Sequence, residues 1–555
     1  FMKYADILII GGGLAALKSA AISAPSGLSV CIAVKDKLCS GASFYPMMDM
    51  VACQTSTGVP EEDERYLQEI LDCSLGMASE EMNRLYIRDI RERVLEFPEI
   101  GVEDFTRSDP KIACFAKTAR PTYCWRDWPK IRAKAKALLA ARENVTLLEK
   151  TSVVALAQKD GRIAGALLMD ENGKVFPLLC KAVILCTGGM GDLYLHNLNT
   201  PDVSGDGQVL ALSLGAPLIN LEFLQFIPGF ISPAYKTVFR EPALRFSDGL
   251  QTRDGRDLLA KYLPNPEDRK ECLRLRACHG PFTSRTLARW FDIAMMEEIL
   301  KDSGPVKGFP IHYREEILTE NHTFIRSYVA WLKDVKHVDI VHDVIYHAPF
   351  YHAANGGIKI DTHCETAIKG LFAAGEVSGG IHGADRQGGH STGSCLVFGA
   401  IAGQNAVAHA KSAEALPLSP QDWLEAWQAV YGKRGQSKLS PQDVLPAVRE
   451  LMYRNGAIIR EESALHTALA QLQSLEAQFS AAPFVKAGGP EAAQAIKAAH
   501  FLRLGQALLL AMDARKESRG SHYRSDYPHM REEFNHRQEL LLFQGKLCVR
   551  QEEAH

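Results

Sequence analysis

Short runs of apolar residues, bounded by glycine or polar residues, mark the strands that we expect in this chain. Mostly apolar runs, as in strands buried on both faces of a parallel sheet, lie at residues 5–10, 28–34, 181–187 and 371–375. Residues 145–165 read as strand, turn and strand, with Asp160-Gly161 at the turn. These runs predict a sheet that is largely parallel.

Helical periodicity marks the remaining regular structure. Residues 60–100 are charged with apolar residues at helical spacing, which indicates a pair of surface helices. From residue 421 onward the same spacing covers residues 444–456, 459–479 and 490–512. The pattern therefore predicts an α/β protein whose C-terminal part is helical.

A glycine-rich motif joins the first predicted strand to a helix that continues to about residue 24. The chain reads Gly11-Gly12-Gly13-Leu14-Ala15-Ala16, which fits G-x-G-x-x-A. Gly11 permits a tight turn, Gly13 lets the backbone approach a pyrophosphate, and the helix start attracts that anion. The motif can also be a strand–helix turn without a ligand, but the second strand that follows favours dinucleotide binding.

Composition narrows the class of protein. The chain has 555 residues, 46% of them hydrophobic and 23% charged, which fits a globular protein of two to four domains. The net charge of −3 argues against a nucleic-acid partner. We see no apolar run of roughly 18 residues and no room for a signal peptide before the first strand. We therefore expect a cytoplasmic protein without a membrane span.

The cysteines give no metal-binding pattern. None of the 13 cysteines stands in a C-x-x-C motif, so we expect neither an iron–sulfur cluster nor a zinc site in this chain. Reduced thiols that partly fill the core are the ordinary explanation. No metal is expected.

Several candidate cofactor- and substrate-binding residues lie between His352 and Gly399. Glu376 ends an apolar run and can accept hydrogen bonds from sugar-like hydroxyl groups. Ser391 is expected to be the N-cap of the apolar helix that follows, whose start would face an anion. Arg386 and two nearby histidines, His382 and His390, suit an anionic substrate.

Several of these segments resemble one family of flavoproteins. Ala373-Ala374-Gly375-Glu376, His382-Gly383-Ala384-Asp385-Arg386 and His390-Ser391 are similar to the pattern AAGE…HGANR-G-NS of fumarate reductase, succinate dehydrogenase and L-aspartate oxidase. Residues 222–228 resemble the family's E-F-x-Q-F-H-P, and residues 517–528 its E-S-R-G-A-H-x-R-x-D-Y-P. The resemblance is strong near both ends of the chain and thin at residues 40–145 and 229–340.

The resemblance implies a fold and a domain organisation. We expect an α/β protein with a Rossmann-like FAD-binding domain, an inserted α+β capping domain and a C-terminal helical domain. The FAD-binding domain would comprise residues 1–228 and 356–415, and the capping domain residues 229–355. Residues 420–555 would form the helical domain with a terminal extension.

The same resemblance implies the residues that bind FAD. They are Gly11, Gly13, Leu14, Ala15, Ala16, Lys35, Ser40, Gly41, Ala42, Ser43, Thr187, Gly188, Gly189, Asp206, Glu376, Arg386, Ser391 and Thr392. Membrane-bound members attach FAD through a histidine in the segment that corresponds to residues 40–46. The first histidine of this chain is His196, so we expect non-covalent FAD.

For the substrate, the resemblance implies a carboxylate held by His352 and Arg386. Arg285 is expected to donate a proton, with Glu241 as a relay and Arg245 in the same motif as Glu241. The alignment of this segment with the family's donor motif is imperfect. If Arg289 is kept aligned with the family's arginine, Ser284 falls at the donor position and Arg285 one residue later. Arg245 and Arg289 would be the next candidates, and a structural ion pair is the alternative role for Arg285.

One departure from the family concerns the substrate itself. Ile227 occupies the place of a substrate-binding histidine in E-F-x-Q-F-H-P. A carboxylate that loses a hydrogen-bonding partner in a buried site costs roughly 1–3 kcal/mol. We therefore expect fumarate to be a poor substrate, and the true substrate to lack a polar group at this point.

The leading functional hypothesis is an FAD-dependent oxidoreductase that moves a hydride between flavin N5 and a small carboxylate. It would reduce an α,β-unsaturated acid or catalyse the reverse dehydrogenation. One alternative is an amino-acid oxidase like L-aspartate oxidase, which needs a carboxylate to hold the ammonium group. Another is a flavoprotein subunit of an iron–sulfur electron-transfer complex. Since this chain lacks cluster motifs, its electrons are expected to pass through a separate electron-transfer protein.

Overall fold

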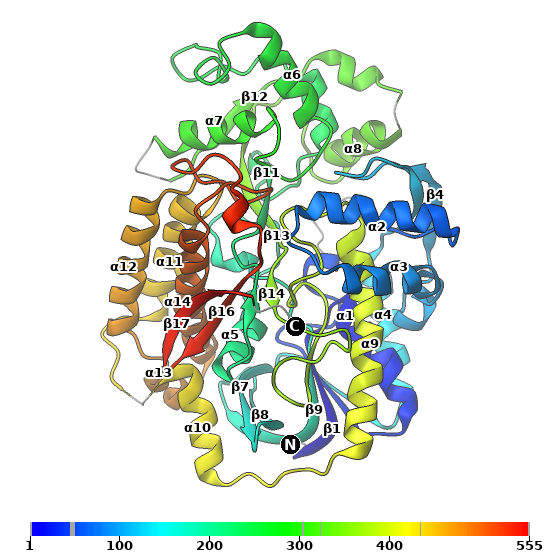
Figure 1. The fold of residues 1–555 in the computed structure, drawn as a ribbon, viewed down its shortest axis with the longest axis vertical. Coiled ribbons are helices and arrows are strands. Elements are labelled where there is room, and N and C mark those ends of the chain that lie inside the picture. Colours follow the sequence, from blue (N-terminus) through cyan, green and yellow to red (C-terminus); the bar gives the residue numbers. More distant parts are fainter. Residues whose placement is uncertain (1–2, 45–49, 302–304, 322, 433–434, 553–555) are drawn as a thin grey trace.

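A seven-stranded sheet carries the glycine motif in this computed structural model, which describes residues 3–44, 50–301, 305–321, 323–432 and 435–552 (Figure 1). Strands β6, β2, β1 and β9 are parallel, β15 pairs with β9, and β8 and β7 continue the sheet antiparallel. The strands are Tyr4–Ile10 (β1), Val30–Ala33 (β2), Val145–Leu148 (β6), Ser152–Lys159 (β7), Arg162–Met169 (β8), Val175–Leu185 (β9) and Leu371–Ala373 (β15). The predicted apolar runs therefore form the buried centre of this sheet.

The predicted turn at Asp160-Gly161 is confirmed, but it joins β7 to β8 rather than closing a hairpin that starts at residue 145. Both turn residues have positive φ, 53° and 72°, which is the backbone of a two-residue hairpin turn. The run at residue 145 is the separate strand β6, and it pairs in parallel with β2.

Two helices pack against each other along one side of the sheet. Helix α1 (Leu14–Ser23) follows the glycine motif, and α9 (His390–Ser412) packs against it and against α3. A Cβ atom on Gly399 would lie 2.8 Å from the carbonyl oxygen of Ala15, so glycine permits this close packing. The apolar small-residue run of the sequence thus lets the middle of α9 approach the start of α1 closely.

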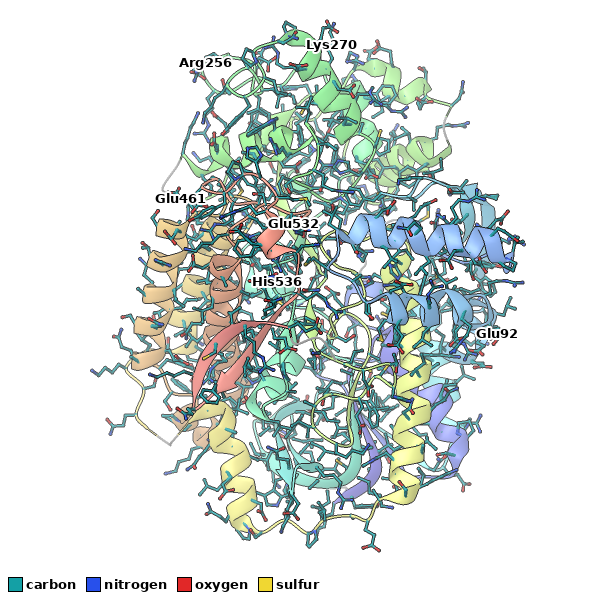
Figure 2. The ribbon with its side chains drawn as sticks, in the orientation of Figure 1. Glu92, Arg256, Lys270, Glu461, Glu532 and His536 are labelled. Atoms are coloured by element: carbon teal, nitrogen blue, oxygen red, sulfur yellow. The ribbon has the colours of Figure 1, made fainter. Side chains whose placement is uncertain are left out.

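The expected pair of surface helices at residues 60–100 is confirmed. They are α2 (Pro60–Ser74) and α3 (Glu80–Leu95), and α4 (Trp128–Ala140) lies beyond a three-stranded sheet of β3 (Val51–Gln54), β5 (Arg120–Trp125) and β4 (Phe105–Lys111). This small sheet was not predicted. Charged side chains such as Glu92, on the outer face of α3, project from the periphery, as do Arg256 and Lys270 (Figure 2).

A lobe at the top of Figure 1 is built on the antiparallel pair β11 and β13, with β12 at the edge. Its elements are β11 (Leu224–Ser232), α6 (Pro266–Arg276), α7 (Arg289–Leu300), β12 (Phe309–Ile311), α8 (Thr323–Asp334) and β13 (Ile345–Ala354). The expected domain boundaries at residues 228 and 355 fall within β11 and just after β13. We propose this lobe as the cap over the glycine motif.

The C-terminal part is helical, as the periodicity predicted. The helices are α10 (Pro420–Tyr431), α11 (Pro441–Gly456), α12 (Glu462–Gln478), α13 (Ala482–Ala487) and α14 (Pro490–Ala514). By length and composition α14 could cross a membrane, which corrects the expectation that no segment is apolar enough. However, 83% of its apolar window is buried inside the protein, so burial in the core explains its composition.

The end of the chain returns to the body of the protein. Strands β16 (Gln538–Phe543) and β17 (Lys546–Gln551) extend a small sheet that contains β10 (Leu218–Ile219) and β14 (Gly357–Ile358), close to helix α5 (Asp206–Ser213). Before them, the fully buried Arg515 pairs with Glu222 at 2.6 Å and with Glu517 at 2.9 Å. These buried ion pairs fasten the C-terminal segment to the start of β11.

Candidate active site

A cavity of about 1640 Å³ runs from the glycine motif at the end of β1 to the cap. This volume exceeds the roughly 300–1,000 Å³ that is usual for one small ligand. At one end it is lined by Gly11, Gly13, Leu14, Ala15, Lys35, Ser40, Gly41, Ala42, Ser43, Thr187, Gly188 and Asp206, then by Glu376, Ser391 and Thr392, and at the cap by Ile227, Arg240, Glu241, His352 and Arg386. Most of the residues predicted for cofactor and substrate therefore face one continuous space.

Two predicted cofactor residues stand behind the wall. Ala16 is buried in the core next to α1's lining residues, and Gly189 makes room for Glu376. A Cβ atom on Gly189 would lie 2.2 Å from Glu376 Oε1. Both residues thus support the wall, and neither is among the residues that line the cavity.

The glycine motif combines a constrained turn with an open approach. Gly11 has φ +124°, and a Cβ atom there would lie 2.2 Å from the carbonyl oxygen of Cys186. Gly13 caps α1 with φ −88°, and a Cβ atom at Gly13 would meet no atom of the described residues within 4 Å. A side chain at Gly13 would therefore extend into the cavity at the positive end of a helix, where a diphosphate can bind.

Lys35 ends the second strand of the motif and is fixed by an acid from another loop. Its Nζ donates to Ser204 Oγ and to Asp206 Oδ2, both at 2.7 Å, and His500 Nδ1 lies 2.7 Å from Asp206 Oδ1. Burial raises the pKa of Asp206, but Lys35 and His500 outweigh burial and hold that pKa well below its usual range. The cavity thus has an anchored lysine and a carboxylate where a nucleoside can be held.

The middle of the cavity has polar groups that a ligand can satisfy. The Oγ1 atom of Thr187 is buried, and no described residue bonds to it. Glu376 Oε1 accepts a hydrogen bond from the Ala354 backbone at 2.8 Å. Burial raises the pKa of Glu376 to about 7, although this hydrogen bond and Arg386 oppose the rise. These groups fit the hydroxyl and amide groups of a cofactor such as FAD.

The start of α9 also opens onto the cavity, but the expected capping residue is wrong. The helix begins at His390, and its N-cap is Gly389 with φ +78°. A Cβ atom on Gly389 would lie 2.8 Å from the backbone nitrogen of Gln54, so both conformation and packing favour glycine. Ser391 and Thr392 stand in the first turn instead, and both line the cavity.

Arg386 and His352 face the cap end of the cavity from two different elements. Both Nε and Nη2 of the buried Arg386 donate to Gln225 Oε1 on β11, at 3.1 and 2.8 Å. Burial, reinforced by the charges of Arg386 and Arg240, lowers the pKa of His352 to about 3. His352 is therefore a neutral hydrogen-bonding group beside a fixed positive charge, which suits a carboxylate.

Arg285 and Arg245, which we expected to act on the substrate, are not among the residues that line the cavity. Arg285 Nε lies 2.8 Å from Asp385 Oδ2, and its guanidinium lies 5.1 Å from the centre of the Phe115 ring. Arg245 is half exposed and lies 3.9 Å from Glu320. The family pattern has asparagine where this chain has Asp385, so here a buried carboxylate holds the partly exposed Arg285.

The predicted histidine pair also lies away from the cavity. His382 and His390 pack against each other, with ring centres 4.7 Å apart, and His390 packs against Tyr86. Both are buried, and burial lowers both pKa values. They are neutral core residues rather than substrate ligands.

Three residues that the sequence did not single out do line the cap end of the cavity or hold its groups. Arg240 precedes Glu241 in the wall, at the position of a threonine in the family. Cys114 donates to Glu241 Oε1 at 3.5 Å and accepts from the Gly280 backbone at 3.3 Å. Gln225 orients Arg386. The sequence could have pointed to Arg240, because it replaces a threonine of the family pattern. It could not have pointed to Cys114, because its partner Glu241 is 127 residues away in the chain.

The raised pKa of Asp385 makes the stability of the protein depend on pH, which can be tested. An unfolded aspartate has a pKa of about 3.9, and burial raises the pKa of Asp385 to about 7 against the opposing charge of Arg285. Below about pH 4 the carboxyl is protonated in both states. As pH rises toward 7, ionisation favours the unfolded chain, so this residue lowers stability in that interval.

The free energy of unfolding of Asp385→Asn minus that of wild type should therefore increase from pH 5 to pH 8. We expect an increase on the order of 1–3 kcal/mol. Thermal unfolding of both proteins at the two pH values measures the difference. Asp36→Asn, at a surface residue paired with Lys150, is the matched control. An unchanged difference between wild type and Asp385→Asn at pH 5 and pH 8 would contradict the raised pKa.

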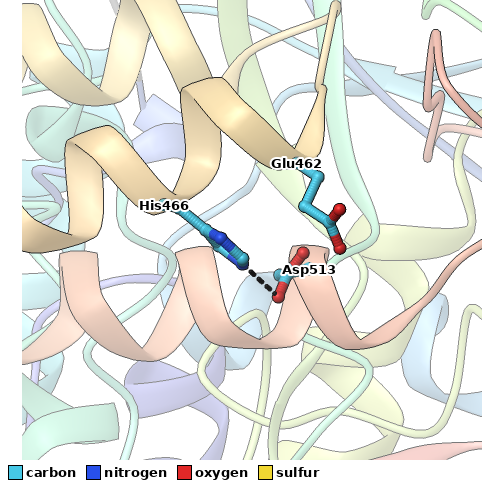
Figure 3. A group of neighbouring side chains, drawn as sticks. All are labelled: Glu462, His466 and Asp513. Atoms are coloured by element: carbon cyan, nitrogen blue, oxygen red, sulfur yellow. Dashed lines mark hydrogen bonds and ion pairs between the residues drawn. The ribbon is translucent and has the colours of Figure 1, made fainter.

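A surface group of potential metal ligands lies outside this cavity. Glu462 and His466 on α12 face Asp513 on α14, and His466 Nε2 lies 2.9 Å from Asp513 Oδ2 (Figure 3). Glu462 already pairs with Lys516 at 2.5 Å, and Arg524 lies 3.7 Å from Asp513. These cations explain the group as a surface ion-pair cluster.

Comparisons with known proteins agree along the whole chain. A family model described as "FAD binding domain" matches residues 6–392, and one described as "Fumarate reductase flavoprotein C-term" matches residues 446–552. An "Uncharacterized FAD-dependent oxidoreductase" of Methanocaldococcus jannaschii is 28% identical over 550 residues, 95% of each chain. A fumarate reductase flavoprotein subunit of Mycobacterium tuberculosis is 24% identical over 563 residues, 95% of this chain and 93% of the relative.

A solved structure shares the fold. The structure of Sdh1 from Mycobacterium smegmatis in complex with UQ1 matches 100% of this chain and 95% of its own, with a TM-score of 0.83 at 24% identity. The expected fold class, a Rossmann-like α/β part with a C-terminal helical part, is thereby confirmed.

Proposed function

Because the chain belongs to the FAD-binding flavoprotein family that includes fumarate reductase, and is an FAD-dependent oxidoreductase, we propose that it acts on a small carboxylate bound beside Arg386 and His352. One observation carries the proposal. These two carboxylate-binding groups line the same cavity as the glycine motif and the start of α9. A carboxylate at Arg386 would therefore share one continuous cavity with the cofactor.

The residues present fit FAD along this cavity. The open face of Gly13 and the start of α1 would hold the diphosphate, and Lys35 and Asp206 lie where the adenosine end would follow. Glu376, Ser391 and Thr392 would contact the flavin end. When bound, FAD supplies two-electron hydride chemistry at its flavin ring. We propose that it is held without a covalent bond, since residues 40–44 contain no histidine; Tyr45 and Pro46 of that segment lie outside the described residues.

Arg386 and His352 would orient the substrate. The fork of Arg386 is held on one side by Gln225, which leaves its remaining N–H groups for a carboxylate. The neutral imidazole of His352 can add one hydrogen bond. Anchoring a conjugated carboxylate here draws electron density toward the carboxyl end, so the distant alkene carbon is the one that accepts hydride.

Arg240 is the group that we propose as the proton donor, in place of Arg285. It lines the cavity next to Glu241, and its charge acts on both His352 and Cys114. Glu241 can return a proton to this region from the cavity mouth. Arg285 is not among the residues that line the cavity, and Asp385 already pairs with its guanidinium.

We expect Arg240→Gln to lower the rate of substrate reduction by roughly 10²-fold or more, the usual size for losing a general acid. Arg285→Gln should stay within about tenfold of wild type. Both variants should keep full FAD content, measured from the flavin absorbance of the purified protein. A larger loss for Arg285→Gln than for Arg240→Gln would return the donor role to Arg285.

Anaerobic reoxidation of the dithionite-reduced protein tests the proposed function. An α,β-unsaturated acid that fits the site should reoxidise the flavin with one molar equivalent, and its amide should react far more slowly. If no unsaturated acid reoxidises the flavin or alters its spectrum, the proposed function is wrong.

A second candidate, oxidation of an amino acid, is favoured by Glu241. Among the described residues this carboxylate contacts the Cys114 thiol and forms no ion pair, so it is available to a substrate ammonium group. Fast reoxidation by air together with reduction by an amino acid would support this candidate.

We also propose that electrons pass through a separate electron-transfer protein. All 13 cysteines are free and scattered, and the M. tuberculosis relative is named as a subunit.

A further inference from the structure

We propose that the substrate is a monocarboxylate with a bulky apolar group, such as an aryl or branched alkyl group on its β-carbon, rather than a short dicarboxylate. This inference rests on the proposed function and adds the chemical class of the substrate. It follows from the distribution of charged and apolar groups around the cap end of the cavity.

The charged groups gather at one place. Arg386, Arg240 and His352 all line the cavity, and the charges of both arginines reach His352. One carboxylate there would be held by two guanidinium groups and a neutral imidazole. Such charge-assisted hydrogen bonds are the strong ones in a buried site.

The wall next to this cluster is apolar. Ile227 lies on β11 two residues after Gln225, and it lines the cavity with Val238 and Phe239, all three with no more than 6% exposure. Backbone groups nearby are already bonded. The Val238 carbonyl accepts from Tyr328 Oη at 2.9 Å, and the Phe239 N–H donates to the Pro228 carbonyl at 3.3 Å.

A second carboxylate placed against this wall would therefore lose its water without gaining a hydrogen bond. An unsatisfied buried charged group costs at least as much as the roughly 1–3 kcal/mol for a neutral one. Apolar carbon in the same place gains about 25 cal/mol for each Å² removed from water. The balance favours a hydrocarbon group beside Ile227.

The cavity then continues outward between apolar residues of the cap and of β4. Phe324, near the start of α8, carries the Arg240 guanidinium over its ring at 5.3 Å. Pro242, Ala277 and Pro281 complete this part of the wall, and Ile112 after β4 is 64% exposed at the mouth. An apolar substrate body extending from the carboxylate would cover Phe324 and Ile112.

The reaction of such a substrate balances without any further group. The π bond between the α- and β-carbons breaks, and two C–H bonds form. Two electrons and one hydrogen come as hydride from the reduced protein, and one proton comes from Arg240. The products are the saturated acid and oxidised flavin, and dithionite supplies the electrons in the assay.

The test uses the flavin-loaded protein and four probes: trans-3-phenylpropenoate, its amide, fumarate and but-2-enoate. We expect the phenyl acid to reoxidise the reduced flavin with at least about tenfold higher kcat/KM than fumarate or but-2-enoate, the scale of discrimination by a hydrophobic pocket. The kcat/KM of the amide should be about 10²-fold or more below that of the phenyl acid, because the neutral amide cannot form an ion pair with Arg386. The saturated acid, 3-phenylpropanoate, should shift the oxidised flavin spectrum without turnover and with a lower Kd than succinate.

Ile227→His places a donor in the apolar wall. It should raise the ratio of kcat/KM for fumarate to kcat/KM for the phenyl acid by about tenfold or more. It should also raise the Kd of 3-phenylpropanoate, with FAD content unchanged. If this variant does not fold, Phe324→Ala tests the outer wall: it should lower kcat/KM for the phenyl acid by a larger factor than kcat/KM for fumarate, because any disturbance of Arg240 affects both substrates alike.

The outcomes separate the two proposals. If fumarate or but-2-enoate is preferred over the phenyl acid by wild type, the apolar substrate class is overturned while the proposed function stands. An amide that reacts as well as the acid overturns the carboxylate anchor. If none of the acids reoxidises the flavin and none shifts its spectrum, the proposed function itself is overturned.

Discussion

The Gly13→Val protein is expected to fold and to carry no flavin. The backbone at Gly13 has φ −88°, which valine also adopts, and a Cβ atom there would meet no atom of the described residues within 4 Å. The substitution therefore leaves the protein itself almost undisturbed. Its side chain would occupy the space at the start of α1 where we place the diphosphate of FAD, so loading should fail.

Flavin content measures this expectation. Wild type should be yellow, and acid precipitation should release all of its flavin as FAD. Gly13→Val should contain less than about one-tenth of the wild-type FAD for the same amount of folded protein. When FAD is limiting, this corresponds to an FAD-binding free energy weaker by more than roughly 1.4 kcal/mol.

Gly435→Val is the matched control, since Gly435 is exposed, has no atom of the described residues within 4 Å of an added Cβ, and lies far along the chain from the cavity. Normal FAD in a folded Gly13→Val protein would contradict the placement of the cofactor.

Arg386→Ala is expected to remove both binding and turnover of the substrate while FAD remains. Arg386 is buried and, among the described residues, bonds to Gln225 and the Gln387 carbonyl without a direct salt bridge, so the substitution breaks no ion pair there. A substrate carboxylate would lose its charged partner, which costs roughly 2–5 kcal/mol in a buried pair. This corresponds to a Kd raised by about 30-fold to several thousandfold.

Titration of the oxidised protein with a saturated acid, followed by the flavin spectrum, gives this Kd. Arg386→Lys should recover only part of the loss, because lysine lacks the planar fork that Gln225 holds. Gln225→Ala should weaken binding less than Arg386→Ala, since it frees the fork without removing its charge. An Arg386→Ala protein that binds the acid as wild type does would move the anchor elsewhere.

The parts of the fold that were predictable depend on local pattern. Mostly apolar runs such as residues 5–10 and 181–187 have few alternatives to a buried strand, and residues 490–512 have the spacing and length of a core helix. The pairing of β16 with β10 could not be predicted, because it joins residues more than 300 apart whose short runs carry no pairing signal.

The candidate site was predictable where backbone geometry required particular residues. Gly11 and Gly13 line the cavity because the turn and the approach both need glycine. Ser391 was assigned as the N-cap from its residue type, but the left-handed backbone of Gly389 ends the preceding loop two residues earlier. A good capping side chain does not move a helix start that glycine conformation already determines.

The arginines show the limit of matching residues one at a time. Arg285 was chosen from an imperfect register, and its role changes because Asp385, a departure from the family's asparagine, lies 2.8 Å away. Arg240 was not among the predicted site residues, and it stands where the family pattern has a threonine. Only the fold brings residues 240, 352 and 386 to one end of a cavity.

The central claim is that one cavity holds FAD along the glycine motif and a carboxylate against Arg386. A crystal structure of the flavin-loaded protein with 3-phenylpropanoate tests it most directly. The claim predicts the FAD diphosphate beside Gly13 and the start of α1, and the carboxylate within hydrogen-bonding distance of Arg386 and His352. FAD outside this cavity, or a carboxylate bound in it without contact to Arg386, would contradict the claim.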